Sequence, residues 1–219
     1  MGTDDIVGDF PGGWPDWFDP TQDHMLTPRR LRGLLHPIRV RLLGLLESDG
    51  PATASQLARR IGESSGVTSY HLRILADHDF IEDDLDRSNG RDRWWKPKYR
   101  GTAFTFRSPD DPIDREGVEA GAQYMRILAD DYHRRMVGFI DSMSAQLDEL
   151  PNLPWTFSDT KIELTTEEGR ALSAEITALV DRYRRTQGHR RTEPGVRRGY
   201  LMFQMLPDPS DSSDEGAES

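Results

Sequence analysis

The chain of 219 residues is acidic, with 28 Lys and Arg against 38 Asp and Glu and a net charge of −10. It contains no cysteine, which excludes disulfide bonds and thiolate metal sites. No apolar run is long enough to span a membrane and the acidic start does not resemble a signal peptide, so we expect a soluble, cytoplasmic protein.

The charge is distributed unevenly along the chain. Residues 25–108 carry 15 basic and 10 acidic side chains, a net of +5, whereas residues 1–24 and 109–152 each carry −6. Residues 153–206 have a net of +2 and residues 207–219 a net of −5. The total alone argues against a nucleic-acid partner, but one basic block in an acidic chain is typical of a nucleic-acid-binding domain.

Residues 1–24 are predicted to form an acidic arm that carries four aromatic side chains in a stretch broken by prolines. These are Phe10, Trp14, Trp17 and Phe18. One interpretation packs the arm on its own domain or across a dimer. The other makes it a lid over an effector pocket or over the DNA-reading surface.

Residues 36–50 predict an amphipathic helix, and residues 51–81 predict two short helices separated by a tight break and followed by a strand. Thr53 is a candidate N-cap of the first short helix. Gly62 suits its end, because glycine adopts the left-handed conformation at little cost. The apolar side chains on its inner side are Leu57, Ala58 and Ile61.

The second short helix is expected to open around residues 64–65 and to run to about His78. Its predicted inner side chains are Thr68, Leu72 and Leu75, and its predicted outer side chains are Ser65, Ser69, Tyr70 and Arg73. Hydroxyls and Tyr can bond phosphates or base edges, and Arg can bind a guanine with two hydrogen bonds. The pattern predicts a DNA-binding helix-turn-helix. Ser64 and Ser65 are equally consistent with helix caps, and we expect His71 to be a partly buried helix residue.

Residues 80–99 predict two strands joined by the turn Ser88-Asn89-Gly90-Arg91, since Asn-Gly is a strong hairpin signal. Arginines crowd its tip: Arg87, Arg91 and Arg93. A basic hairpin after a helix-turn-helix is predicted to be a wing that contacts the DNA backbone or minor groove. The alternative is that Arg87 and Arg93 are solvated charges. Trp94 and Trp95 alternate across a strand, so one of them should pack inward.

Three motifs occur in order: His36-Pro37-Ile38-Arg39 followed by Leu42 and Leu45, then Ser69-Tyr70-His71-Leu72-Arg73-Ile74-Leu75, then the Asn-Gly-Arg turn. Over residues 26–106 the chain resembles the ArsR-type winged helix family of bacterial transcription regulators. The resemblance implies a homodimer that represses a promoter and dissociates when an effector binds. It also implies that Ser65, Ser69, Tyr70 and Arg73 face the groove and that Arg91 lies at the wing tip.

Residues 108–112 are predicted to be a linker, and residues 115–150 a long helix with apolar residues three and four positions apart. We interpret it as the dimerisation element, with candidate contacts at Met125, Tyr132, Met136, Phe139 and Met143. A seam inside a single bundle would give the same pattern. We favour the dimer, because two half-sites need two reading heads.

Asp131-Tyr132-His133 resembles half of the histidine and carboxylate metal site found in many regulators of this type. The second half is missing, since residues 143–147 contain no histidine. We therefore predict no metal and no cofactor.

The rest of the chain is predicted to form a small α/β unit over residues 153–207, followed by a disordered acidic tail over residues 208–219. The unit would contain a strand at 155–164, a helix beginning at 165–168 and a strand at 199–207. The expected fold class is mainly α with small β (α+β): an arm at 1–24, a winged helix-turn-helix at 25–108, a linker and long helix at 109–152, and this unit.

These features predict a sequence-specific DNA-binding regulator, a homodimeric repressor of an operator in double-stranded DNA, released by a small organic effector. Candidate walls of the effector pocket are Met125, Tyr132, Met136, Trp155, Phe157 and Phe203. For any one of these residues taken singly, a place in the core or the dimer is the simpler interpretation. The alternative function is a non-sensing DNA-binding module whose C-terminal unit recruits a protein partner. With no glycine-rich phosphate loop and no nucleophile elbow, we do not expect an enzyme, nor a membrane partner.

Overall fold

A computed structural model describes residues 23–26, 28–87, 92–99, 101–104, 115–185, 193–197, 199–206 and 208. The chain divides into a first unit, Met1–Ser142, and a second unit, Met143–Ser219. The predicted arm up to residue 22, the linker, the Ser88–Arg91 turn and the tail beyond residue 208 lie outside the described residues. No described helix is both long enough and apolar enough to cross a membrane.

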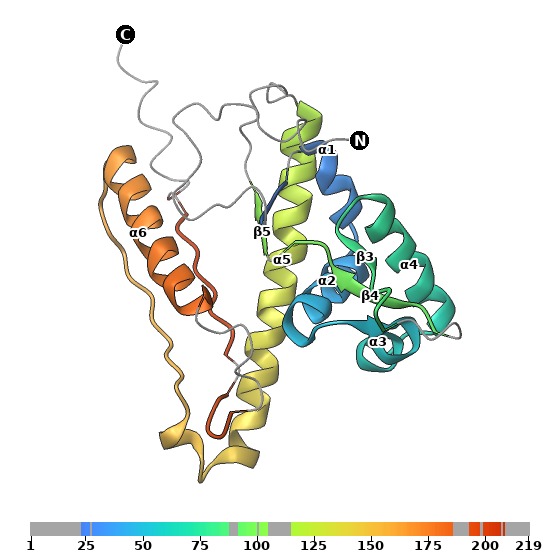
Figure 1. Cartoon of the computed structure of the whole chain (residues 1–219). Coiled ribbons are helices and arrows are strands. Elements are labelled where there is room, and N and C mark those ends of the chain that lie inside the picture. Colours follow the sequence, from blue (N-terminus) through green and yellow to red (C-terminus); the bar gives the residue numbers. More distant parts are fainter. Residues whose placement is uncertain are drawn as a thin grey trace. The chain divides into compact units, whose positions relative to one another are not determined.

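The first unit contains short helices, short strands and one long helix (Figure 1). In chain order they are β1 (Asp23–Leu26), α1 (Pro28–Leu31), the 3-10 turn Arg32–Leu34, α2 (Pro37–Asp49), β2 (Ala52–Thr53), α3 (Ala54–Ile61), α4 (Ser65–Asp77), β3 (Ile81–Asp83), β4 (Trp94–Pro97), β5 (Gly101–Phe104) and α5 (Arg115–Ser142).

The strands form two small sheets. Strands β2, β4 and β3 are antiparallel neighbours in that order, with Asp83 opposite Trp95 and Ile81 opposite Pro97. The predicted pairing of two strands around the wing turn is therefore confirmed. Strands β1 and β5 form a separate parallel pair. Neither this pair nor β2 follows from the sequence, because each needs a partner far along the chain.

The core of the first unit lies between α2, α3, α4 and β4. Leu42, Leu46, Leu72 and Leu75 are fully buried, and Leu57 is almost so. Fully burying one such side chain contributes about 1.5–3 kcal/mol, so these residues fix α2, α3 and α4 against one another. The expected alternation at the two tryptophans is also confirmed, because Trp95 is buried while Trp94 is only half-buried.

Helix α5 is shorter than the expected span of 115–150. It ends at Ser142 and is followed by the 3-10 turns Met143–Gln146 and Leu150–Asn152. The Ser142 hydroxyl donates a hydrogen bond to the carbonyl of Phe139 at 2.7 Å. Such local bonds give the backbone an alternative to continuing the helix, which the apolar spacing beyond residue 142 does not reveal.

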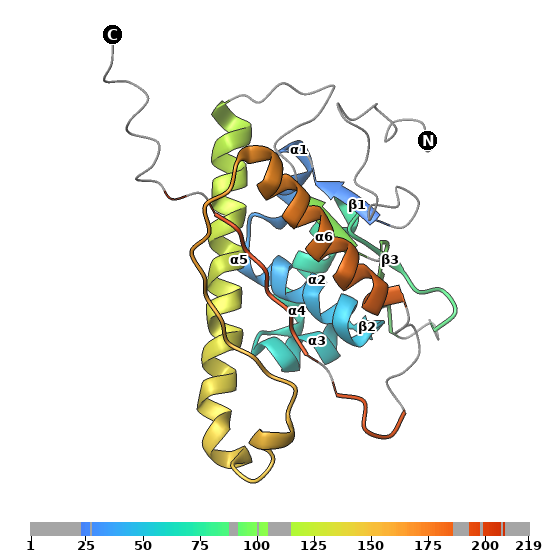
Figure 2. The ribbon, with the colours of Figure 1, turned by 90° about the vertical axis from the view of Figure 1, so that its left-hand side faces the viewer.

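The second unit contains α6 (Thr166–Arg185). The helix start predicted at residues 165–168 is confirmed, because the Glu168 N–H donates to Thr165 Oγ1 at 3.2 Å and the Glu168 carboxylate accepts the Thr165 N–H at 2.8 Å. The two strands predicted beside this helix are wrong. Residues 155–164 and 199–206 have no regular secondary structure and are drawn as coil in Figure 2. A strand exists only where it pairs with another, and no pairing joins these described stretches.

Candidate nucleic-acid interface

Helix α3 is capped at both ends. Thr53 and Gln56 form a capping box, in which Gln56 N–H donates to Thr53 Oγ1 at 3.3 Å and Thr53 N–H donates to Gln56 Oε1 at 2.9 Å. At the other end Gly62 has φ of 76° and donates its N–H to the carbonyl of Ala58. Both predicted helix ends are confirmed, and the left-handed conformation of Gly62 turns the chain from α3 toward α4.

Helix α4 has the inner and outer sides that the sequence predicts. Ser64 is its N-cap and accepts the N–H of Val67 at 3.2 Å, so the cap interpretation of Ser64 is confirmed. Thr68, Leu72 and Leu75 are completely buried. On the outer side Ser65, Tyr70 and Arg73 are exposed, and Ser69 is half-buried. A polar outer side on the second of two angled helices can contact base edges in a major groove.

Two of the three predicted wing arginines make ion pairs within the wing. Arg93 binds the carboxylate of Asp83 through Nε and Nη2 and lies 4.1 Å from the ring centre of Trp95. Arg87 pairs with Asp84 at 3.3 Å and lies 5.8 Å from the ring of Trp94. Both guanidinium groups stay more than half exposed, so they remain able to meet a phosphate. Arg91 lies outside the described residues.

The Arg93–Asp83 ion pair depends on strand register, because the pairing of β3 with β4 places Asp83 opposite Trp95, two residues after Arg93. The Arg87–Asp84 pair is local, between residues three positions apart. The hydrogen bonds from Arg93 lower the pKa of the Asp83 carboxyl. Near the base of the wing, Lys98 pairs with Asp79 at 2.7 Å. The wing is thus held by paired charges that sequence spacing alone does not identify.

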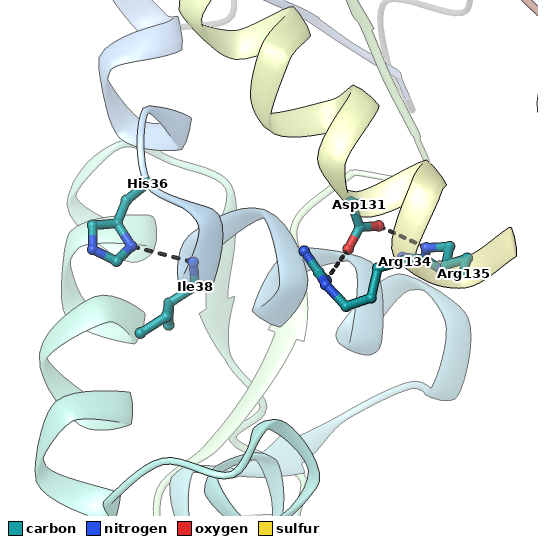
Figure 3. Close-up of polar contacts among 5 residues, drawn as sticks. All are labelled: His36, Ile38, Asp131, Arg134 and Arg135. Carbon is teal, nitrogen blue, oxygen red and sulfur yellow. Dashed lines mark hydrogen bonds and ion pairs between the residues drawn. The ribbon is translucent and has the colours of Figure 1, made fainter. Parts of the chain in front are cut away.

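A compact polar cluster lies where α2 meets α4. His36 is the N-cap of α2, and its Nδ1 accepts the N–H of Ile38 at 3.2 Å (Figure 3). The His36 ring centre lies 4.3 Å from that of His71, which is 7% exposed and contacts the edge of Tyr70. Burial, and secondly the positive charge of Arg39, lowers the pKa of His36. His71 is a buried helix residue, more enclosed than the partly buried position expected.

Asp131 holds two arginines on α5. Its carboxylate accepts hydrogen bonds from Arg134 at 2.7 Å and Arg135 at 2.6 Å, and the residue is only 5% exposed (Figure 3). The neighbouring His133 is exposed. A Cβ built on Gly44 would lie 3.3 Å from Arg135 Nη2, so the Asp131–Arg135 pair lies against α2. In the part of the chain that the structure describes, no group of three or more potential metal ligands comes together.

The long helix turns one side toward its own domain. Its buried residues are Gly117, Gly121, Tyr124, Ile127 and Asp131. None of these belongs to the predicted dimer contacts. Of those contacts, Met125 is 43% exposed and the other four are half-buried.

The predicted effector walls fall in both units, Met125, Tyr132 and Met136 in the first and Trp155, Phe157 and Phe203 in the second. Their grouping into one pocket stays a prediction. A separate open cavity of about 370 Å³ lies between α2 and α3, and Leu45, Leu57 and Arg59 are among its lining residues.

Comparison with known proteins agrees with this geometry. Residues 34–84, from the start of α2 to the end of β3, match the family model of a helix-turn-helix domain. No curated protein matches the chain. A solved structure titled "Structure of Disulfide formed AbfR" has 13% identity over 52% of this chain and 71% of that chain, with a TM-score of 0.26. The chain therefore contains a helix-turn-helix domain, the DNA-binding module of transcription regulators.

Proposed function

We propose that this protein is a sequence-specific, homodimeric transcriptional repressor of the ArsR-like winged helix type, released from its operator by a small organic effector. The observation that carries the proposal is the outer side of α4, where hydroxyl, Tyr and Arg side chains stand exposed above a fully buried inner side. That surface suits a helix lying in the major groove.

Each interface residue then has a distinct role. Arg73 reads a guanine, and Ser65, Ser69 and Tyr70 bond phosphates or base edges. In the wing, Arg87, Arg91 and Arg93 meet the DNA backbone or minor groove. The wing arginines contribute mainly affinity, because phosphate contacts carry no sequence information.

The dimer is supported by a second side of α5, next to the one that faces its own domain. Val118 and Met125 are 45% and 43% exposed, and Tyr132 and Phe139 continue the same seven-residue spacing. Apolar residues repeated every seven positions form a seam that pairs with another helix. A dimer through this seam supplies the two reading heads that an operator with two half-sites requires.

An organic effector fits the residue types available. Met and aromatic side chains form adaptable apolar walls, and the second unit exposes many of them, including Trp155, Phe157 and Phe203. The same exposure favours the alternative function, a non-sensing DNA-binding module whose second unit recruits a protein. A compound that raises the unfolding temperature and also releases the protein from DNA supports the sensor. If no compound releases the protein from DNA and a co-purifying protein buries these side chains, the recruiting module replaces the sensor as the proposed function.

The central test compares Arg73→Ala with Arg126→Ala, which removes the same charge from an exposed position on α5. Fluorescence anisotropy would measure binding to the DNA upstream of the gene and to scrambled DNA of equal length. We expect Arg73→Ala to cost about 1–3 kcal/mol on the upstream DNA and much less on scrambled DNA, and Arg126→Ala to change neither. Equal losses on both DNAs would refute base reading by Arg73.

A further inference from the structure

We propose that Arg39 of α2 binds a DNA phosphate together with Tyr70 of α4, so that the two side chains form one clamp at the edge of the recognition helix. The inference rests on the proposed DNA-binding function and adds to it a contact from α2, a helix outside the α3–α4 pair. Arg39 is not among the interface residues that the outer side of α4 identifies.

The first observation is an unsatisfied cation. Only two buried side-chain polar atoms among the described residues have no hydrogen-bond partner, Arg39 Nε and His71 Nδ1, and both belong to the cluster where α2 meets α4. Burial lowers the pKa of Arg39. A buried polar atom without a partner destabilises the fold, whereas the Arg39 residue as a whole is only half-buried and stays accessible to a partner outside the chain.

The second observation is the absence of an internal counter-ion. Arg60, Arg93 and Arg135 each pair with a carboxylate. No carboxylate lies within ion-pair distance of Arg39 in the described part of the chain. A half-buried arginine without an internal counter-ion suits an anion supplied by a partner, and phosphate matches the planar guanidinium group.

The third observation is the path from Arg39 to the recognition surface. The ring centres of His36 and His71 lie 4.3 Å apart, and those of Tyr70 and His71 lie 5.2 Å apart in a T-shaped arrangement. Tyr70 is 58% exposed on the outer side of α4, one turn from Arg73. Arg39 lies one turn after His36 on α2, where its N–H donates to the His36 carbonyl at 3.0 Å, and its positive charge contributes to lowering the pKa of His71. It therefore lies close to this row of rings.

The arrangement fits the way helix-turn-helix domains dock. The first helix of the motif, here α3, crosses the phosphate backbone while the recognition helix α4 enters the groove, so backbone phosphates flank α4. Here α2 packs against α4 through buried leucines. A phosphate next to Tyr70 would then meet Arg39 from α2, which would fix the depth at which Arg73 reaches a base.

The test uses Arg39→Met, with Arg41→Met as the matched control. Arg41 carries the same charge on the same helix, and two residues of helical rotation place it on nearly the opposite side. Binding to random duplex DNA across a salt series counts phosphate contacts, and thermal unfolding measures the fold. For Arg39→Met we expect the slope of log affinity against log salt to fall by about 0.9 per reading head, with no decrease in unfolding temperature. Arg41→Met should keep the wild-type slope.

Arg39→Lys is the second variant, for the case in which Arg39→Met does not fold. Lysine keeps the positive charge but lacks the planar guanidinium group that binds phosphate through two hydrogen bonds. Arg39→Lys should therefore keep the wild-type salt slope and bind DNA a few-fold more weakly. If Arg39→Met binds DNA as tightly as the wild type and with the same salt slope, the inference is overturned but the proposed function is not. The same holds if Arg39→Met keeps the wild-type salt slope and its unfolding temperature decreases strongly. Wild-type protein that binds no DNA at low salt overturns the proposed function and the inference together.

Discussion

At the scale of single residues, two histidines share a nearly dry position beneath the recognition surface. His36 uses Nδ1 to accept the N–H of Ile38, so this nitrogen carries no proton while it caps α2. His71 faces His36, Arg39, Tyr70 and the charge of Glu63. Its pKa is lowered by burial first, then by the positive charges of His36 and Arg39, while Glu63 opposes the shift. Both shifts favour the neutral form of each ring.

This neutrality predicts a direction for the pH dependence of stability. A histidine with a lowered folded-state pKa binds its proton more tightly after unfolding, so stability is complete above the ordinary pKa of 6.5 and decreases as the pH falls below it. We expect His71→Gln to weaken the fall in unfolding temperature between neutral and mildly acidic pH. His133→Gln, at an exposed position on α5, should leave it unchanged. Identical pH profiles for wild type and His71→Gln would contradict the account.

Residue-level features were predictable from the sequence where their causes are local. Thr53, Gln56 and Gly62 set the ends of α3 through contacts within a few residues. The Arg93–Asp83 pair and the unpaired Arg39 were not predictable, because the first depends on strand register and the second on how α2 packs against α4.

At the scale of elements, α5 combines two apolar sides with different partners. One side buries Gly117, Gly121 and Tyr124 against its own domain, and the adjacent side leaves Met125 43% exposed. The sequence indicated the second side through its seven-residue spacing. The sequence did not identify Tyr124 and Ile127 as residues buried against their own domain. When a helix has a wide apolar surface, the spacing of its apolar residues does not show which part of that surface contacts which neighbour.

If the second side of α5 is the dimer seam, one charge placed in it should separate the protomers. Met125→Asp would place an unpaired carboxylate at the interface twice in a symmetric dimer, at a cost of several kcal/mol. We expect it to sediment as a monomer. The matched control is Gln123→Asp, which adds the same charge at an exposed position facing elsewhere on the helix. A Met125→Asp protein that sediments as the wild type does would move the interface to another surface.

Helices and strands differed in how well the sequence predicted them. Helices α2, α3 and α4 satisfy their backbone groups internally, so periodicity and caps define them. The apolar stretches 155–164 and 199–206 have strand-like composition, yet no partner strand pairs with them in the described residues. Composition indicates which residues tolerate a strand, while pairing decides whether a strand forms.

At the scale of the whole molecule, charge and apolar surface are segregated. The basic block at residues 25–108 coincides with the helix-turn-helix match at residues 34–84. The second unit exposes large apolar side chains, such as Phe157 at 78%, Leu201 at 69% and Leu206 at 75%. Exposed apolar patches of this kind mark interaction sites. The helix-turn-helix domain thus lies in the first unit, and we propose that this unit reads DNA while regulation enters through the second.

Selection of bound DNA from a random duplex library, followed by sequencing, tests the central claim most directly. A homodimer that reads each half-site through α4 should enrich an inverted repeat whose half-sites lie about 10 base pairs apart, centre to centre, or a multiple of that spacing. Arg73→Ala should lose the preference at one position in each half-site. Enrichment of single unpaired sites would contradict the dimer. No enrichment over the starting library would contradict sequence-specific reading.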